Sequence, residues 1–205
     1  MALDLTIFLL TSLAIILTPG QDLLMVMSRG VTQGASAGVV TALGVSTGLL
    51  GHTLLATFGV GALLLASDAL FFVVKLLGAA YLLYLGFKLL LARQSEIHAI
   101  ACEPKPLWRC YLTGAVSNLT NPKVTLFYFA YLPQFIPAGH QNPYLLLMLG
   151  ALFAALTFVV KAPIGYFAGR CSQWVLRHPL VLLRFNQLSG VVLISFGVKL
   201  AFARK

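Results

Sequence analysis

The stretch "ILTPGQDLLMVMSRG", residues 16–30, places a Pro-Gly pair and a carboxylate, Asp22, inside an apolar run. A charge in hydrocarbon is costly, and a proline interrupts the hydrogen-bond ladder of a helix, so neither is expected in a membrane helix without a role. The stretch therefore predicts a broken transmembrane helix with a functional carboxylate next to the break.

The composition of the chain predicts a membrane protein. Of its 205 residues, 60% are hydrophobic and only 9% are charged, which lies outside the range of soluble globular domains. The first twenty residues, "MALDLTIFLLTSLAIILTPG", contain no Lys or Arg and so lack the basic region of a cleavable signal peptide. We expect them to form a retained first span.

Six apolar stretches reach the roughly 17 to 25 residues that a membrane-spanning helix needs. They cover residues 3–27, 37–60, 68–91, 110–132, 144–168 and 185–203. Lys and Arg occur in the loops after the first, third and fifth stretches and are absent from the loops after the second and fourth. Because cytoplasmic loops are enriched in basic residues, we expect the three basic loops in the cytoplasm and both termini outside.

Several other classes of protein are not expected. The net charge of +9 comes from basic residues between apolar stretches, where the positive-inside rule accounts for them without a nucleic-acid partner. The three cysteines, Cys102, Cys110 and Cys171, have no metal-ligand spacing and are expected to be ordinary thiols. The chain also lacks H-E-x-x-H, a phosphate loop and paired carboxylates. We therefore expect no enzyme, no cofactor and no metal.

Two parts of the sequence look like copies of each other. Residues 76–93, "LLGAAYLLYLGFKLLLAR", match residues 187–204, "QLSGVVLISFGVKLAFAR", and both end in G-x-K-L-x-x-A-R. This shared ending favours duplication over a chance match of two Leu-rich helices. The first and fourth spans also correspond, because Pro19 in "LTPGQD" aligns with Pro122 in "TNPKVT".

The predicted fold is an all-α polytopic membrane protein with six transmembrane helices. Residues 1–93 and 110–205 each form a three-helix repeat, and residues 94–109 form a cytoplasmic linker. Since three spans per repeat is an odd number, the repeats insert with opposite orientation, as in inverted-topology transporters. The first and fourth helices are broken. Breaks at matching positions of inverted repeats are typical of a binding site at the membrane midplane.

Asp22 in the first span and Lys123 in the fourth provide opposite charges near the predicted midplane. The functional hypothesis is that Asp22 accepts a substrate ammonium group or a coupling proton. Lys123 and the backbone N–H groups freed near Pro19 and Pro122 would then receive a carboxylate. A zwitterion such as an amino acid fits this arrangement. The alternative is a buried ion pair between Asp22 and Lys123 that only fixes helix packing.

Polar residues near the breaks and in the second span have two interpretations each. Gln21 and Asn121 could bind substrate, although capping of a helix end is the more common role of Asn at such a position. Gly20, next to Pro19, belongs to the backbone of the first break. His52 could relay protons, but such a histidine is more often a hydrogen-bonded core residue.

Lys161, Tyr84 and Tyr128 are secondary candidates. Lys161 lies several residues inside the end of the fifth span, and long basic side chains at such positions usually extend to the membrane interface. This is the favoured interpretation, although Pro163 could open the helix there. The two tyrosines could line a substrate path, but packing and interfacial anchoring are more common roles.

The motifs together resemble one known family. "TPGQDLLMVMSRGVTQGASAGV", "KLLGAAYLLYLGFKLL", "NPKVTLFYFAYLPQF" and "LSGVVLISFGVKLA" are similar to segments of the LysE/RhtB family of bacterial amino-acid exporters, in the same order over essentially the whole chain. The resemblance implies a small inner-membrane secondary exporter driven by the proton gradient or by exchange. It also implies that the family's signature elements are here Pro19, Gly20, Asp22, Asn121, Pro122 and Lys123.

The chain departs from the family pattern in two places. The family usually has P-G-P where this chain has Gln21 as the third residue, and Lys161 with Pro163 is unusual in the fifth span. Both departures lie where substrate choice could be set.

Three functions are compatible with the sequence. The first is a proton-coupled exporter of amino acids or their derivatives, in which one three-helix half rocks against the other around the midplane site. The second is a passive channel for small solutes, and the third is a membrane scaffold that transports nothing. Packing alone does not require two broken helices, which argues against a scaffold. The expected partners are an amino acid, protons and the lipid bilayer, and the sequence leaves a homo-oligomer open.

Overall fold

The computed structural model describes residues 5–18, 20–66, 68–91, 104–130, 132–135, 143–168 and 179–202. Over these ranges the chain is helical and contains no strand, so the all-α prediction is confirmed there. The elements are, in chain order, α1 (Leu5–Leu17), α2 (Gln21–Gln33), α3 (Ala35–Ala66), α4 (Asp68–Leu90), α5 (Leu107–Leu119), α6 (Pro122–Ala130), the short 3-10 helix η1 (Leu132–Phe135), α7 (Pro143–Tyr166) and α9 (Pro179–Phe202).

The helices have the apolar surfaces expected in a lipid bilayer. Among the described helices, the segment Ala35–Gly59 of α3 and the whole of α7 are long and apolar enough to cross a membrane, and α1 with α2 would make a third, bent span. Large apolar side chains such as Phe58, Met148 and Val159 are mostly exposed, which soluble proteins avoid on this scale. These features define an all-helical membrane protein, and the count of six spans stays a prediction.

Both predicted helix breaks are present. The axes of α1 and α2 meet at a bend of 56°. Gly20 between them has an extended backbone (φ −161°, ψ −178°), and Pro19 lies outside the described residues. The second break separates α5 from α6, which begins at Pro122. Proline is favoured at a first helical position because the N–H group it lacks would have no intrahelical acceptor there.

Glycines bring the helices around α3 into backbone contact. α3 and α7 run antiparallel, with Gly38 against Gly165 near one end and Thr53 against Gly150 further along. A Cβ atom on Gly165 would lie only 2.7 Å from the carbonyl carbon of Gly38, and a second close neighbour is Val26 of α2. α5 packs on α3 through similar glycine contacts. The spacing between these helices therefore depends on residues without side chains.

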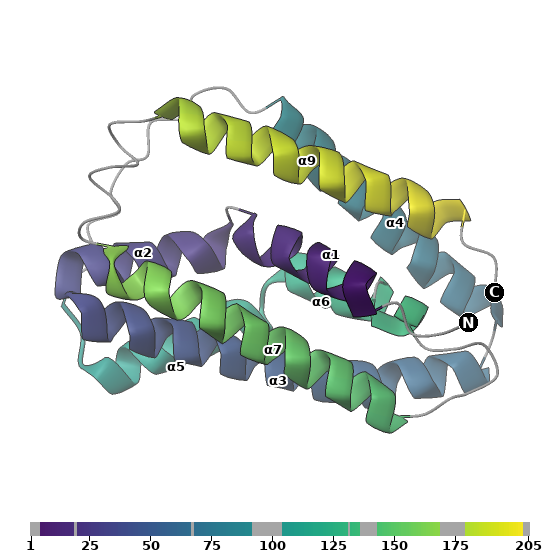
Figure 1. The fold of residues 1–205 in the computed structure, drawn as a ribbon. Coiled ribbons are helices and arrows are strands. Elements are labelled where there is room, and N and C mark those ends of the chain that lie inside the picture. Colours follow the sequence, from purple (N-terminus) through teal and green to yellow (C-terminus); the bar gives the residue numbers. More distant parts are fainter. Residues whose placement is uncertain are drawn as a thin grey trace.

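α4 and α9 pack on each other as an antiparallel pair beside this group (Figure 1). Gly86 of α4 lies against Gly190 and Ile194 of α9, while Gly197 of α9 lies against Ala79 and Leu83 of α4. These helices contain the two segments that look like copies in the sequence. Glycines at matching positions of the two segments, Gly86 and Gly197, thus lie in the same interface.

The largest hydrophobic cluster lies where α1, α3, α6 and α7 meet. Its buried members include Phe8, Leu49, Tyr128 and Phe153. The rings of Tyr128 and Phe153 meet edge to face with 5.8 Å between their centroids, a favoured geometry for aromatic pairs. This cluster provides apolar surroundings for polar groups next to the two helix breaks.

We expect Gly165→Leu to destabilise the fold, because the new side chain would force α7 away from α2 and α3. Overpacking a core costs about 1–3 kcal/mol, and here the obstacle includes backbone atoms. The thermal unfolding midpoint of the purified protein in detergent should fall by several degrees. Ala155→Leu, at an exposed position of the same helix, is the matched control and should leave the midpoint unchanged. Equal midpoints for the two variants would contradict the close contact between α3 and α7.

Candidate functional site

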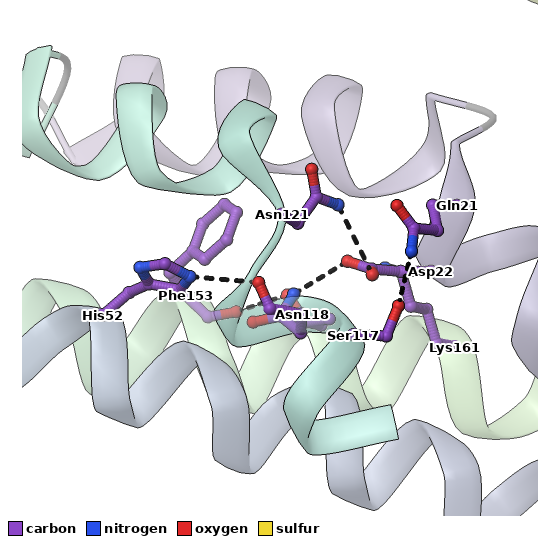
Figure 2. A network of polar contacts seen from close by, with 9 residues as sticks. Gln21, Asp22, His52, Ser117, Asn118, Asn121, Phe153 and Lys161 are labelled. Atoms are coloured by element: carbon purple, nitrogen blue, oxygen red, sulfur yellow. Dashed lines mark hydrogen bonds and ion pairs between the residues drawn. The ribbon is translucent and has the colours of Figure 1, made fainter. Parts of the chain in front are cut away.

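Asp22 is the centre of a buried polar network at the break between α1 and α2 (Figure 2). It lies in the first turn of α2, where the partial positive charge of a helix N-terminus stabilises an anion. Only 6% of its surface is exposed. Asn118 donates a hydrogen bond of 2.7 Å from Nδ2 to Asp22 Oδ2, and Asn121 donates a longer one of 3.5 Å to Oδ1. The two breaks thus bring a carboxylate and two amides together inside the bundle.

Lys161 of α7 supplies the opposite charge. Its Nζ atom lies 3.6 Å from Asp22 Oδ2, and each of the two side chains is 8% exposed. The interpretation that Lys161 extends to the membrane interface is therefore wrong. Lys161 turns inward because Asp22 offers a counter-charge where an unpaired ammonium would be costly. Pro163 does not end the helix, since α7 continues to Tyr166.

The network continues through Asn118 to His52 of α3. The Nε2 atom of His52 lies 3.0 Å from the backbone oxygen of Asn118, and since a carbonyl oxygen only accepts, Nε2 has the proton. The other ring nitrogen, Nδ1, has no hydrogen-bond partner among the described residues. The ring lies 5.6 Å from that of Tyr128 between centroids. His52 is thus a buried residue that Asn118 connects to the Asp22 carboxylate.

Gln21 and Lys123 occupy the starts of the two helices that follow the breaks. Gln21 donates from Nε2 to Ser117 Oγ at 2.8 Å, which joins α2 to α5. Lys123 is the second residue of α6, and its side chain lies outside the described residues. The predicted meeting of Asp22 with Lys123 therefore stays a prediction, and Lys161 is the partner that the structure describes.

The two tyrosines among the secondary candidates have different places. Tyr128 is fully buried, and Thr53 donates to its hydroxyl oxygen at 3.4 Å. Tyr84 is 60% exposed on α4 and is not among the residues that line the cavity at Asp22. The structure thus brings Tyr128 close to His52 and leaves Tyr84 on the surface of the bundle.

A cavity of about 40 Å³ lies next to the ion pair. Asp22, Lys161 and Asn121 form its polar lining together with Gln21 and two threonines. Small-molecule pockets usually measure about 300–1,000 Å³, and a water molecule needs at least about 10–15 Å³ of cavity volume. In this conformation the cavity therefore has room for a few water molecules, and an amino acid can bind only when the surrounding helices separate.

One member of the network was missed by sequence reasoning. The segment "SNLTNPK" contains two asparagines, and only Asn121 adjoins the proline, so Asn118 received no role. No local signal singled it out, because α5 ends at Leu119 and Asn121 lies between the two helices, so helical spacing does not relate the two asparagines. The partnership of Lys161 with Asp22 was also missed, since Lys161 is close enough to the end of α7 to reach the membrane interface.

One segment of α3 matches a hydrolase motif in sequence only. Residues 44–48, "GVSTG", have the G-x-S-x-G pattern. They lie within a continuous helix, whereas the nucleophile of that motif requires a sharp turn from a strand into a helix. In the described part of the chain, no three His, Cys, Asp or Glu side chains gather in a group that could hold a metal ion.

A carboxylate, an ammonium group and two amides within hydrogen-bond reach can recognise a small zwitterion. Helices that break beside buried charged residues are typical of membrane transporters. The fold and the site thus define a protein of the transporter class. The model of the LysE type translocator family matches residues 13–204, and the chain belongs to this family. The resemblance to the LysE/RhtB exporters is confirmed.

Several relatives match the chain over nearly its whole length. The leucine efflux protein of Klebsiella pneumoniae is 33% identical over 204 residues, which cover 95% of this chain and 92% of that protein. The homoserine/homoserine lactone efflux protein of Salmonella typhimurium is 31% identical over 198 residues, 96% of this chain and 95% of that protein. The membrane protein YrhP of Bacillus subtilis is 31% identical over 193 residues, 90% of this chain and 91% of that protein. No solved structure matches the chain.

We expect Lys161→Met to destabilise the protein, because it leaves the Asp22 carboxylate buried without a counter-charge. Removing one partner of a buried ion pair typically costs roughly 3–5 kcal/mol, whereas replacing both can be nearly neutral. Asp22→Asn with Lys161→Met should therefore regain most of the lost stability, measured as unfolding in denaturant and detergent. Lys88→Met, at an exposed position of α4, is the control and should have little effect. Additive losses in the double variant would show that the two side chains do not interact.

Proposed function

We propose that this protein exports amino acids or their derivatives from the cytoplasm across the bacterial inner membrane, driven by the entry of protons. The observation that supports this most strongly is the ion pair of Asp22 and Lys161, which is buried at a helix break beside a cavity. Relatives named for the efflux of leucine and of homoserine or homoserine lactone support such a substrate.

An amino acid can bind between Asp22 and Lys161 without leaving either of their charges unpaired. Its ammonium group replaces Lys161 beside Asp22, and its carboxylate binds Lys161 in turn. Asn118 and Asn121 hold the Asp22 carboxylate in place during the exchange. Because each buried charge keeps a partner, the desolvation cost that excludes ions from hydrocarbon stays small. Lys123 and the first N–H groups of α6 are a second place for the substrate carboxylate.

The same carboxylate exchanges a substrate for a proton. Asp22 binds either the substrate ammonium or a proton, since both use the same two oxygen atoms. A proton that arrives from outside releases the substrate there, and loss of that proton to the cytoplasm prepares Asp22 for the next substrate. His52 is a secondary candidate for holding the proton, because Asn118 connects it to Asp22.

The contacts of α4 with α9 support two inverted three-helix halves. In the alignment that pairs Gly86 with Gly197, Ala79 corresponds to Gly190. The contact between Gly86 and Gly190 then has a counterpart in the contact between Gly197 and Ala79. In the same way, Gly86 contacts Ile194 while Gly197 contacts Leu83, and Ile194 and Leu83 correspond to each other in the alignment. Such reciprocal contacts are expected when two copies pack about a two-fold axis. In alternating access, these halves rock against each other around the site.

The distribution of basic residues supports an orientation in the membrane. Three basic residues, Arg29 of α2, Lys105 just before α5 and Arg109 of α5, lie close in the fold. Gln33 at the end of α2 donates to the Lys105 backbone oxygen at 2.8 Å. The positive-inside rule assigns this end of the bundle to the cytoplasm. The start of α1 and the end of α9 lie at the opposite end (Figure 1), which corresponds to termini on the outer side.

The export proposal is tested by efflux of labelled leucine and homoserine from preloaded cells. We expect flux above the empty-vector background that stops when an uncoupler collapses the proton gradient. Asp22→Asn should reduce this flux at least about tenfold, since an amide cannot exchange an ammonium for a proton. Asp68→Asn, the same change at the first residue of α4, is the matched control and should retain export.

Two outcomes of this experiment favour the alternative functions. Flux that continues in the presence of the uncoupler would identify a passive channel. Full activity after neutralising both Asp22 and Lys161 would remove the site from transport altogether. Protein amounts in the membrane are compared by immunoblot, so that lost expression is not mistaken for lost transport.

The orientation predicts the behaviour of reporter fusions. Alkaline phosphatase, which is active only outside the cytoplasm, should be active when fused after the last residue and inactive when fused after residue 100, in the loop predicted to be cytoplasmic. Green fluorescent protein should give the reverse pattern. Phosphatase activity at both sites would contradict an odd number of spans between them.

A further inference from the structure

The cavity at Asp22 has two chemically different ends. Asp22, Lys161 and Asn121 form the polar end. The remainder is lined mainly by aliphatic and aromatic side chains of α1, α3, α6 and α7, among them Ile15, Ile16, Leu49, Val124, Phe127 and Phe153. A zwitterion held at the polar end would therefore extend its side chain into an apolar environment.

We infer that this site selects amino acids with an uncharged, apolar side chain of intermediate length, such as leucine or methionine, over amino acids with a hydroxyl or a charge in that position. The inference rests on the proposed export of amino acids and adds the chemical class of the side chain. It draws only on the lining of the cavity, since the relatives differ in the amino acid for which they are named.

The hydroxyl groups in the lining are already used as donors. Thr157 Oγ1 donates to the backbone oxygen of Phe153 at 2.8 Å, and Thr18 Oγ1 donates to that of Ala14 at 2.6 Å. The amide of Gln21 donates one of its two N–H groups to Ser117. Among the described side chains, the lining away from the polar end thus offers a substrate hydroxyl only the second N–H group of Gln21 and the lone pairs of the two threonine oxygens. A substrate hydroxyl there would exchange its hydrogen bonds with water for at most one or two of these, a loss that an apolar side chain does not have.

A charged substrate side chain would meet a larger penalty. The carboxylate in the described lining is that of Asp22, and in the proposed binding mode it is already paired with the substrate ammonium. A lysine side chain would therefore place a second cation among the apolar residues without a counter-charge, which proteins avoid. An acidic side chain would compete with the substrate's own carboxylate for Lys161.

The positions of the lining residues along α7 limit how long the side chain of the substrate can be. Thr157 lies about one helical turn from Lys161 and Phe153 about two turns, so the two residues lie roughly 6 Å and 12 Å along the axis from Lys161. The ring of Phe153 packs against Phe127 with 4.9 Å between centroids, and both residues are buried. An extended side chain of about the length of leucine or methionine covers most of the first interval, and the aromatic pair closes the far end of the site beyond it, whereas the side chain of alanine is too short.

The test measures the initial efflux of labelled alanine, leucine, methionine, homoserine, threonine, lysine and glutamate from proteoliposomes with an imposed proton gradient. Leucine and methionine should leave fastest. Homoserine and threonine should be slower by roughly ten- to a hundredfold, the range by which an apolar pocket discriminates against one added or missing group. Lysine and glutamate should stay at the background of protein-free vesicles.

Variants of the aromatic pair connect the selectivity to this cavity. Phe153→Leu opens space at the apolar end and should raise efflux of phenylalanine relative to leucine by about tenfold. Phe58→Leu, an aromatic-to-leucine change at a lipid-exposed position of α3, is the matched control and should leave the ratio unchanged.

The outcomes separate this inference from the proposal on which it rests. Homoserine or lysine efflux as fast as leucine efflux would overturn the apolar selectivity and leave amino-acid export standing. A phenylalanine-to-leucine ratio that does not change in Phe153→Leu would equally overturn the assignment of the side-chain site to this cavity. No efflux of any of the seven amino acids would overturn both.

Discussion

The ion pair between Asp22 and Lys161 places two charges in a bundle that otherwise buries mostly apolar side chains, and either charge alone would be costly there. Their mutual attraction does not remove this cost by itself. The helix N-terminus at Asp22 and the amide groups of Asn118 and Asn121 provide the additional stabilisation that a buried carboxylate needs. The N-terminus of α2 exists because of the first break, and Asn118 and Asn121 lie next to the second.

Close helix packing is the second condition for the network. Lys161 reaches Asp22 because α7 lies against α2 and α3, and this approach depends on Gly38 and Gly165 at the contact. Gly48 lies in the same way next to Asn118, whose Cβ atom would be 2.9 Å from a Cβ added to the glycine. Small residues thus do more than permit packing. They determine which polar side chains come within hydrogen-bond distance of one another.

The local sequence predicted the helices and the breaks because their signals are local. Apolar length and the Pro-Gly and Asn-Pro pairs are properties of neighbouring residues, and the structure has a break at each pair. The partner of Asp22 depends on the distance between α2 and α7, which lie far apart in the sequence, and composition gives no measure of that distance. The prediction of Lys123 rested on its charge near the predicted midplane, the repeat and the family signature, and none of these contains information about α7. Asn118 was missed for the related reason that its importance comes from the orientation of α5 at the break.

The geometry of the pair is suited to a site that must release as well as bind. The separation of 3.6 Å is longer than the about 2.7–2.9 Å of a charge-assisted hydrogen bond between an ammonium and a carboxylate. A substrate ammonium that approached Asp22 at the shorter distance would gain energy relative to Lys161, while Lys161 would regain a partner in the substrate carboxylate. In the proposed cycle, the loaded site moves with both charges paired to the substrate, so this movement adds no penalty of an isolated charge in the membrane. The return movement has a proton on Asp22, so the carboxyl group is neutral and Lys161 has lost its counter-charge. Loss of the proton to the cytoplasm restores the ion pair, and the cost of the unpaired ammonium favours that loss.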